Sequence, residues 1–310
     1  MHRLLLSLAF APLLVLPSSA QDGGKVKLEW KFKKGDTHRY EISTTFVVDA
    51  PKTPISLDTL LGLSMEVVDV SAEGTGTIKA TFDRLRYKMT APRDSLDYDS
   101  DRDKKKPDEE VAAKVLASFV GRSMTMTLSK KGECLKVEGV DEILEGAIKE
   151  FPDGMKKVTD ALKKSLSDDR AKGLMQTSLS CLPADAVGPG ESWEGSASLS
   201  MGILGKADMK SKATLKELRA KGAEAVIDVD TRVGLKVSET GWPLPGMELL
   251  EGKMPMEMVW LVEQGVMQSS KGELKFELSI GANSPLISAS IKQEMKLAPR
   301  KKDEPAKEAK

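Results

Sequence analysis

The chain contains little histidine, little cysteine and few aromatic side chains. Among 310 residues there are 2 His and 2 Cys, and Phe, Trp and Tyr together make up 5%. His2 lies in an N-terminal segment that we expect to be removed, which leaves His38 as the imidazole for metal or acid–base chemistry. A zinc site built on paired histidines, or a Ser-His-Asp triad, is therefore excluded unless His38 serves it. No Gly-x-Ser-x-Gly elbow, Walker loop or Gly-x-Gly-x-x-Gly motif is present, so we expect no enzyme activity and no cofactor.

The chain also lacks net charge and a second long apolar run. Lys plus Arg and Asp plus Glu number 47 each, whereas surfaces that bind nucleic acid are strongly basic. We therefore expect no nucleic-acid partner. Beyond the N-terminal segment no run of about 20 apolar residues occurs, so the mature protein is not expected to be an integral membrane protein.

The N-terminus has the order of a secretory signal peptide. A positive start at Arg3 precedes an apolar stretch from Leu4 to Leu16, and Ser18-Ser19-Ala20 forms a cleavage site of small residues. An uncleaved anchor would need about 20 apolar residues without a breaking proline. The pattern predicts a signal peptide over residues 1–20, cleavage after Ala20, and an exported protein that is periplasmic or extracellular.

The two cysteines, Cys134 and Cys181, would both remain after cleavage. Export would place them where a disulfide can persist, so their pairing is one hypothesis. Separate burial as two small apolar side chains is the alternative.

Most of the chain alternates apolar and polar residues with a period of two, which is typical of half-buried strands. One such segment places Ile78, Ala80 and Phe82 on one face and then changes phase, so that Leu85 and the residues two apart from it continue the face. The change of phase predicts a β-bulge near residues 83–84. The fold class predicted is mainly β with a helical insert (α+β), with long antiparallel strands in a curved sheet or half-barrel of two similar halves.

Helical periodicity is confined to two regions. A helix is predicted over residues 108–120, and residues 141–182 form a predicted helical insert. These helices are the expected cover for the apolar face of the sheet. The predicted organisation is a signal peptide (1–20), a first β-rich half (21–140) with the helix at 108–120, the insert (141–182), a second β-rich half (183–298) and a disordered tail (299–310).

The two β-rich halves share a spaced pattern. Val67, Gly74, Ile78 and Arg84 recur with the same offsets from the glycine as four residues of the second half, which are Leu215, Gly222, Val226 and Arg232. Each half then carries a glycine between two strand segments, Gly132 in the first and Gly265 in the second. The pattern favours a duplicated β unit, with chance similarity between hairpins as the alternative.

Turn and strand motifs distributed over the chain also resemble a known family. They are Trp30-Lys31-Phe32, Lys34-Gly35-Asp36, Tyr98-Asp99-Ser100, the Leu128–Gly132 turn and the Gly188–Trp193 segment. Together they resemble an uncharacterised family of exported bacterial proteins, the domain-of-unknown-function family 6263. The resemblance implies an exported β-rich protein and supplies no catalytic residue.

A run of alternate carboxylates is the strongest metal motif in the chain. Asp97, Asp99 and Asp101 have the spacing of the first ligands of a calcium loop, and Asp108 occupies the twelfth position. Arg102 replaces the glycine that such a loop needs. A weak calcium site and a solvated charged loop are both open interpretations.

Methionines cluster near the C-terminal end of the second half. Met254, Met256, Met258 and Met267 lie within 14 residues of one another. Flexible thioethers suit a surface that accepts lipids, and they are also common core filler. These four residues are the speculative ligand-binding set.

The leading functional hypothesis is an exported, non-enzymatic envelope protein that binds an apolar ligand, with a lipid or an envelope protein as possible partners. One alternative is a hydrolase of envelope polymers that uses two carboxylates. The other alternative is a purely structural or protein-interaction module.

Overall fold

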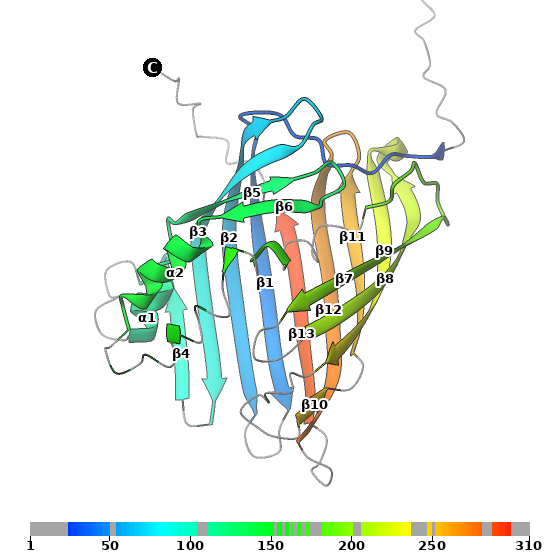
Figure 1. The fold of residues 1–310 in the computed structure, drawn as a ribbon. Helices are drawn as coiled ribbons and strands as arrows, with labels where there is room; N and C mark the ends of the chain where they lie inside the picture. The colour runs from blue at the N-terminus through cyan, green and yellow to red at the C-terminus, as the bar shows by residue number, and fades with distance from the viewer. Residues whose placement is uncertain are drawn as a thin grey trace, which may run out of the picture.

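Long strands form wherever apolar and polar residues alternate, because successive side chains of a strand point to opposite faces. The structure, a computed structural model, describes residues 24–49, 54–92, 94–103, 111–151, 182–200, 206–236, 247–249, 252–280 and 287–298, with a few residues between 154 and 173. The strands are β1 (Thr37–Asp49), β2 (Ile55–Val70), β3 (Gly76–Ala91), β4 (Asp94–Asp99), β5 (Ser123–Leu128), β6 (Cys134–Glu138), β7 (Ser192–Ser200), β8 (Lys206–Arg219), β9 (Glu224–Lys236), β10 (Met247–Leu249), β11 (Gly252–Leu261), β12 (Val266–Ile280) and β13 (Ile287–Leu297) (Figure 1). The expected signal peptide, cleavage site and tail lie outside the described residues.

The strands form one 13-stranded antiparallel sheet in which the first and last strands are neighbours. The order is β6-β5-β3-β2-β1-β13-β12-β11-β9-β8-β7, with β4 beside β3 and β10 beside β12. The prediction of a mainly β fold with long antiparallel strands is therefore confirmed. The sheet is neither closed nor strongly curled, because β6 and β7 end the strand order and do not pair with each other in the described part of the chain (Figure 1). The prediction of a half-barrel is therefore wrong.

The predicted β-bulge is present in the β2/β3 hairpin. Gly62 pairs with Arg84 and Leu63 pairs with Phe82, so Asp83 has no partner in the register. The extra residue restores the inward face of β3 after the change of phase. A Cβ atom on Gly62 would collide with the Asp83 carboxylate, so the bulge requires glycine at this position.

The two described α-helices are short and lie beside one end of the sheet. They are α1 (Val111–Ala117) and α2 (Val140–Ile148), while a brief 3-10 turn, η4 (Ala220–Gly222), joins β8 to β9. The helix predicted over 108–120 is shorter, because the chain turns after Ala117 and Gly121 has φ 82°. α2 lies against β5 and α1 against α2, and neither described helix makes an extensive contact with the central strands (Figure 1). In the described residues the predicted helical cover is limited to α2, whose Ile143 packs in an apolar core with Leu63 of β2, and much of the 141–182 insert lies outside the described residues.

Two apolar cores form at the same end of the long strands, which we call the packed end. The first-half core is built from β2, β3, β5, β6 and α2, and it contains Leu63, Val67, Ile78, Ala80, Met124, Met126, Leu128, Cys134, Val137 and Ile143. The second-half core is built on β8, β9, β11 and β12, and it includes Trp260, Ile227, Leu215, Met258 and Met267.

An extended N-terminal segment joins these two cores. Leu28 and Trp30 belong to the second-half core, and Phe32 packs against both cores. The Trp30 ring stacks on Phe32 at 6.0 Å and meets the edge of Trp260 at 4.9 Å between ring centroids. The backbone N–H of Trp30 donates to the carbonyl of Lys130 at 2.7 Å, which ties the segment to the β5/β6 turn.

The strands β1–β6 and the strands β7–β12, which we call the first and second runs, contain the same local hydrogen bonds. The Gly35-Asp36 turn before β1 bonds through its N–H and C=O groups to Val67 of β2. The Gly190-Glu191 turn before β7 bonds in the same way to Leu215 of β8. Both glycines have positive φ, 89° and 86°, a region that disfavours other residues. β1 and β7 therefore begin in the same local geometry.

Register shifts recur at matching places as well. A shift follows Val67 in the β2/β3 hairpin, and one follows Leu215 in the β8/β9 hairpin. Another lies at Thr127-Leu128 in β5/β6 and again at Val259-Trp260 in β11/β12. Four strands of the first run, β2, β3, β5 and β6, thus have counterparts with the same irregularities in β8, β9, β11 and β12.

Candidate functional site

Beyond the packed end, one face of the long strands stays apolar. Residues directly opposite each other in neighbouring strands lie on the same face. From the register, the side chains that share a face with Phe46 are Ile42 and Val48 of β1, Leu57 and Leu61 of β2, Leu85 and Met89 of β3, Leu96 of β4, Met254 and Met256 of β11, Leu274 and Phe276 of β12, and Ala289, Ile291 and Met295 of β13. We call this set the apolar face, and the strand ends that carry it the open end.

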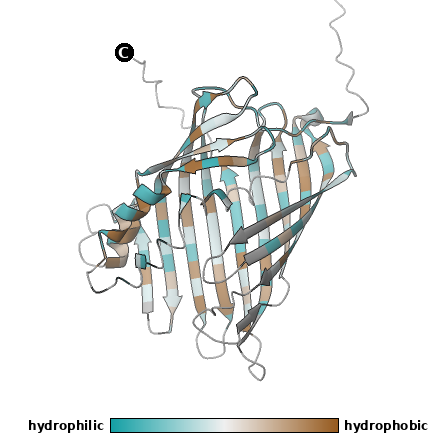
Figure 2. Cartoon of the chain, in the orientation of Figure 1, coloured by the Kyte–Doolittle hydropathy of each residue, from teal (hydrophilic) through white to brown (hydrophobic). Residues whose placement is uncertain are grey.

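Most side chains of the apolar face are half-buried and not enclosed. Ile42, Phe46, Leu57 and Ile291 are all of intermediate exposure, whereas Leu28 and Trp260 at the packed end are 1% exposed. Figure 2 shows the apolar and polar residues alternating along these strands. The described residues of the open end therefore present hydrocarbon to solvent at a cost in free energy of about 25 cal/mol per Å².

In β1, β2, β3, β11, β12 and β13, the described positions of the apolar face, as the register defines it, hold no Asp, Glu, Lys or Arg; in β4 the register puts Asp94 at its edge, opposite Ala91. The polar side chains on the same face carry hydroxyl, amide and phenol groups, and examples are Thr44, Thr59 and Gln293. Burying an isolated charge in such surroundings would cost several kcal/mol, so an uncharged face is suited to an uncharged or hydrocarbon ligand.

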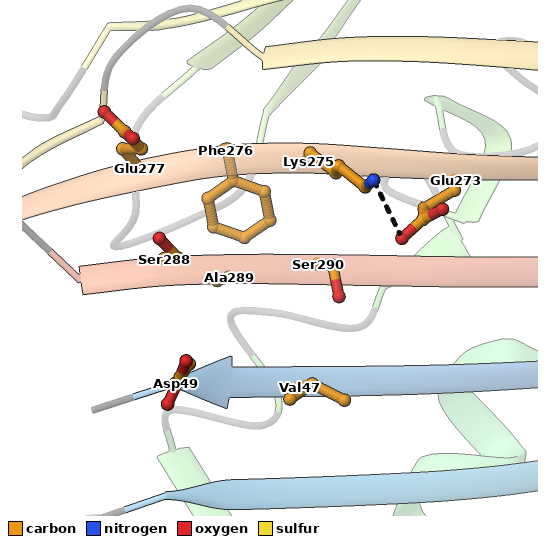
Figure 3. A pocket seen from close by; sticks show the side chains of 9 residues that line it. All are labelled: Val47, Asp49, Glu273, Lys275, Phe276, Glu277, Ser288, Ala289 and Ser290. Atoms are coloured by element: carbon orange, nitrogen blue, oxygen red, sulfur yellow. Dashed lines mark ion pairs between the residues drawn. The ribbon is translucent and has the colours of Figure 1, made fainter. Parts of the chain in front are cut away.

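The opposite face is densely charged and carries a surface depression. That depression has a volume of about 430 Å³ and lies across the open ends of β1, β13 and β12 (Figure 3). Its lining includes Val47, Asp49, Glu273 and Lys275, and the Glu273 carboxylate lies 3.7 Å from the Lys275 ammonium. Glu273 and Lys275 are paired with each other, and the depression is open to solvent, so it offers no enclosed space to a ligand.

The methionines predicted to bind a ligand are divided between two environments. Met258 and Met267 are each 3% exposed and pack in the second-half core around Trp260. Met254 and Met256 are half-buried on the apolar face of β11. Core filling thus accounts for two of the four residues, and a ligand-binding role stays a prediction for Met254 and Met256.

The carboxylates of the proposed calcium loop lie beside arginines. Arg102 reaches Asp97 at 3.1 Å, and Arg84 reaches Asp99 at 3.5 Å and Asp101 at 3.1 Å. Asp99 also accepts the backbone N–H of Asp101, which with Arg84 holds the pKa of Asp99 below its usual value. Among the described residues no group of three or more His, Cys, Asp or Glu is arranged to hold a metal ion, and Asp108 lies outside them. Arg84 and Arg102 supply the positive charge beside these carboxylates, and calcium binding stays a prediction.

Cys134 is buried in the first-half core with a free thiol, 3.7 Å from the carbonyl oxygen of Lys136. Burial raises the pKa of this thiol above its usual value. Cys181 lies outside the described residues, so the pairing of the two cysteines stays a prediction.

Tyr40 links the two halves at the boundary between the packed end and the open end. Its hydroxyl donates to the carbonyl of Met267 at 3.0 Å, across 227 positions of sequence. Burial raises the pKa of Tyr40 well above its usual value. His38, two residues earlier, is half-buried opposite Met65.

The apolar face is the feature that sequence reasoning did not assemble. Every strand that contributes to it shows alternation, but the register that aligns Phe46 with Leu57 and Ile291 joins residues up to 245 positions apart. The strongest available signal was the alternation itself, since it marks which residues share a face within one strand.

No described helix is both long and apolar enough to cross a membrane. A comparison with curated proteins found no significant match.

Solved structures match this chain at low sequence identity and with TM-scores below 0.5. One is a structure of lipid–protein interactions in lipovitellin, with 13% identity and a TM-score of 0.49, covering 90% of this chain and 27% of that one. Another is the β domain of the Bordetella autotransporter BrkA, with 9% identity and a TM-score of 0.23, covering 84% and 98% of the two chains. A third is DynF from the dynemicin biosynthesis pathway of Micromonospora chersina, with 8% identity and a TM-score of 0.18, covering 93% and 92%. The chain spans about a quarter of the lipovitellin chain, and none of these likenesses bears on function.

A family model matches residues 73–259, from the turn before β3 into β11, and its description is a family of unknown function, DUF6263. The resemblance noted from the turn and strand motifs is therefore confirmed. Because the match spans more than half of the 310 residues, the chain belongs to the DUF6263 family.

Proposed function

We propose that this protein is an exported, non-enzymatic protein of the cell envelope that holds an apolar ligand against the apolar face of its sheet. The observation that carries the proposal is the half-buried, uncharged face of the open end, which extends over β3, β2, β1, β13, β12 and β11. The signal-peptide pattern of residues 1–20 supports export.

The dimensions of the face suit a hydrocarbon chain. From Ile42 to Val48 the strand rises about 20 Å, at about 3.3 Å per residue, which is comparable to an extended acyl chain. The face is also wide, because each neighbouring strand adds about 4.8 Å. Covering it with hydrocarbon would contribute about 0.8 kcal/mol for each buried CH2 group, so even one chain could bind with useful affinity.

The two alternatives receive less support from the described residues. A carboxylate hydrolase needs a general acid with a raised pKa, whereas the described carboxyl groups with shifted pKa values are all shifted down: Glu73, Asp99, Glu191 and Glu294. A protein-interaction module would use the same apolar face, and a protein partner is therefore an outcome of the test below.

We also propose that the sheet is built from two similar halves, residues 21–140 and 183–298, separated by the segment 141–182. The recurring turn hydrogen bonds and register shifts support this division. The packed end then consists of one core for each half, with the N-terminal segment between them.

Native mass spectrometry of the mature protein purified from its own export compartment tests the function, with the denatured sample as reference. An additional mass of lipid size that is lost on denaturation is expected. A bare mass under conditions that preserve known lipid complexes, together with a bound polypeptide, would instead favour the protein-interaction module.

Two neighbouring substitutions identify the face that binds. Phe46→Asp places a charge on the apolar face and should reduce the bound fraction at least tenfold, whereas Val47→Asp places it on the opposite face, where Val47 is 37% exposed, and should leave binding unchanged. Equal binding by both variants would contradict the assignment of the ligand to this face.

A further inference from the structure

Polar side chains cross the apolar face in a single row. Thr44 of β1 lies directly opposite Thr59 of β2 and Gln293 of β13, and the row continues through Tyr87 of β3 to Tyr98 of β4. We call these five residues the polar row. Because they occupy neighbouring strands at one level, the row is about 19 Å long.

Apolar rows flank the polar row on both sides. Toward the packed end, Ile42 is aligned with Leu61, Leu85 and Met295. Toward the open end, Phe46 is aligned with Leu57, Met89 and Ile291. Each flanking row is about 7 Å from the polar row, since residues two apart in a strand share a face. A ligand lying along the strands would therefore meet hydrocarbon, then polar groups, then hydrocarbon again.

Two members of the polar row retain hydrogen-bonding capacity. The Thr44 hydroxyl and the Gln293 carboxamide have no side-chain hydrogen-bond partner among the described residues, and Gln293 is exposed. Thr59 donates only a long bond of 3.4 Å to the Thr44 carbonyl. The second half differs, because Ser211 and Thr231 on the corresponding face bond to each other at 2.9 Å. The capacity to bond a ligand is thus concentrated near β1, β2 and β13.

We infer that the ligand of the apolar face is an uncharged acyl ester, with hydrocarbon on both sides of a carbonyl that the polar row binds. The Thr44 hydroxyl and the Gln293 N–H groups donate to the ester carbonyl oxygen, while the hydrocarbon on either side covers the rows of Ile42 and Phe46. The face carries no Lys or Arg at its described positions, so it offers no cationic partner to a phosphate or free carboxylate group. This inference rests on the proposed function and names the ligand class for the same face.

Binding of three pyrene-labelled probes of equal length to the delipidated protein tests the inference: an acyl ester, a pure hydrocarbon and a phosphate monoester. The wild-type protein should bind the ester about tenfold more tightly than the hydrocarbon, the effect of one or two neutral hydrogen bonds. The phosphate monoester should bind more weakly than the ester. Equal affinity for ester and hydrocarbon, or tighter binding of the phosphate, would overturn the inference.

Substitutions in the polar row sharpen the test. Thr44→Val combined with Gln293→Leu keeps the size and β-forming character of the side chains, and it should lower ester affinity to that of the hydrocarbon without changing hydrocarbon binding. Thr45→Val makes the same change on the opposite face, where the Thr45 hydroxyl donates to Asp58 at 2.7 Å, and should keep the preference for ester. A preference that survives in the double variant contradicts the role of the row.

The same binding experiment distinguishes a failure of the proposed function from a failure of the ester assignment. If neither the ester nor the hydrocarbon binds to the wild-type protein, the proposed function itself is contradicted. If both bind equally, the apolar face retains its function and only the ester assignment is wrong.

Discussion

The two ends of the long strands follow the same alternating pattern but have different surroundings. At the packed end, Leu63 and Ile227 are covered by hairpins, by the N-terminal segment or by α2, and they are 7% and 1% exposed. At the open end, Ile42 and Phe46 are also apolar and follow the same alternation, yet they are half-buried. An alternating strand specifies an apolar face, and the rest of the chain decides whether that face becomes a core or a binding surface.

The largest expected effect separates the two ends by stability. Trp260→Ala should lower the free energy of unfolding by about 3–5 kcal/mol, because it removes a buried indole that contacts Trp30. Phe46→Ala should cost about 1 kcal/mol in the ligand-free protein, since its ring is only half-buried. Urea unfolding of both variants measures the difference. Similar losses would show that the open end is packed as tightly as the core.

The β-bulge gives the next comparison, between two glycines in strands. Gly62→Ala should cost about 1–3 kcal/mol, because the new methyl group would meet the Asp83 carboxylate and the Arg84 side chain. Gly195→Ala in β7 has open space around the added Cβ and should change stability by less than about 0.5 kcal/mol. Thermal unfolding distinguishes the two variants, and a neutral Gly62→Ala would contradict the steric account of the bulge.

The smallest expected effect concerns the ion pairs beside β4. Asp99→Asn should lower stability at pH 7 by about 0.5–1 kcal/mol, since the Asp99 side chain is 16% exposed and paired with Arg84. The folded-state pKa of Asp99 is lowered, so its stabilisation is present above the ordinary value of 3.8 and is lost as pH falls below that value.

Urea unfolding at pH 7 and at pH values below 3.8 tests this dependence. The difference between wild type and Asp99→Asn should shrink as the pH falls. Asp97→Asn is the control, because Asp97 is 48% exposed and its pairing with Arg102 should contribute little. A difference between wild type and Asp99→Asn that is constant with pH would mean that the carboxylate charge is not responsible.

Alternation and turn residues were enough to predict the strands, the antiparallel class and the bulge at Asp83, because these features depend on residues close in sequence. The proposed repeat is offset by one residue in the sequence pattern. The spacing from the glycines matches Ile78 with Val226, whereas the strand register matches the Val67–Ile78 pair with the Leu215–Ile227 pair. The η4 turn makes the second hairpin loop longer by one residue, and spacing counted from a glycine could not show this.

The site was harder to predict for a physical reason. Thr44 and Gln293 become neighbours only because β1 pairs with β13, and no local propensity specifies which strands pair. The methionine cluster gave a partial signal, since Met254 and Met256 do lie on the apolar face while Met258 and Met267 fill a core. The extent of the helical cover was not predictable, because amphipathicity shows that a helix has an apolar side and does not identify the surface it covers.

The most direct test of the apolar face as a binding surface is photo-crosslinking with a diazirine-bearing acyl ester, followed by mapping of the labelled peptides. We predict saturable labelling of the open-end segments around Phe46, Leu57 and Ile291, with competition by an unlabelled ester. Labelling confined to the charged face around Glu273, or unsaturable labelling spread over the chain, would contradict this account.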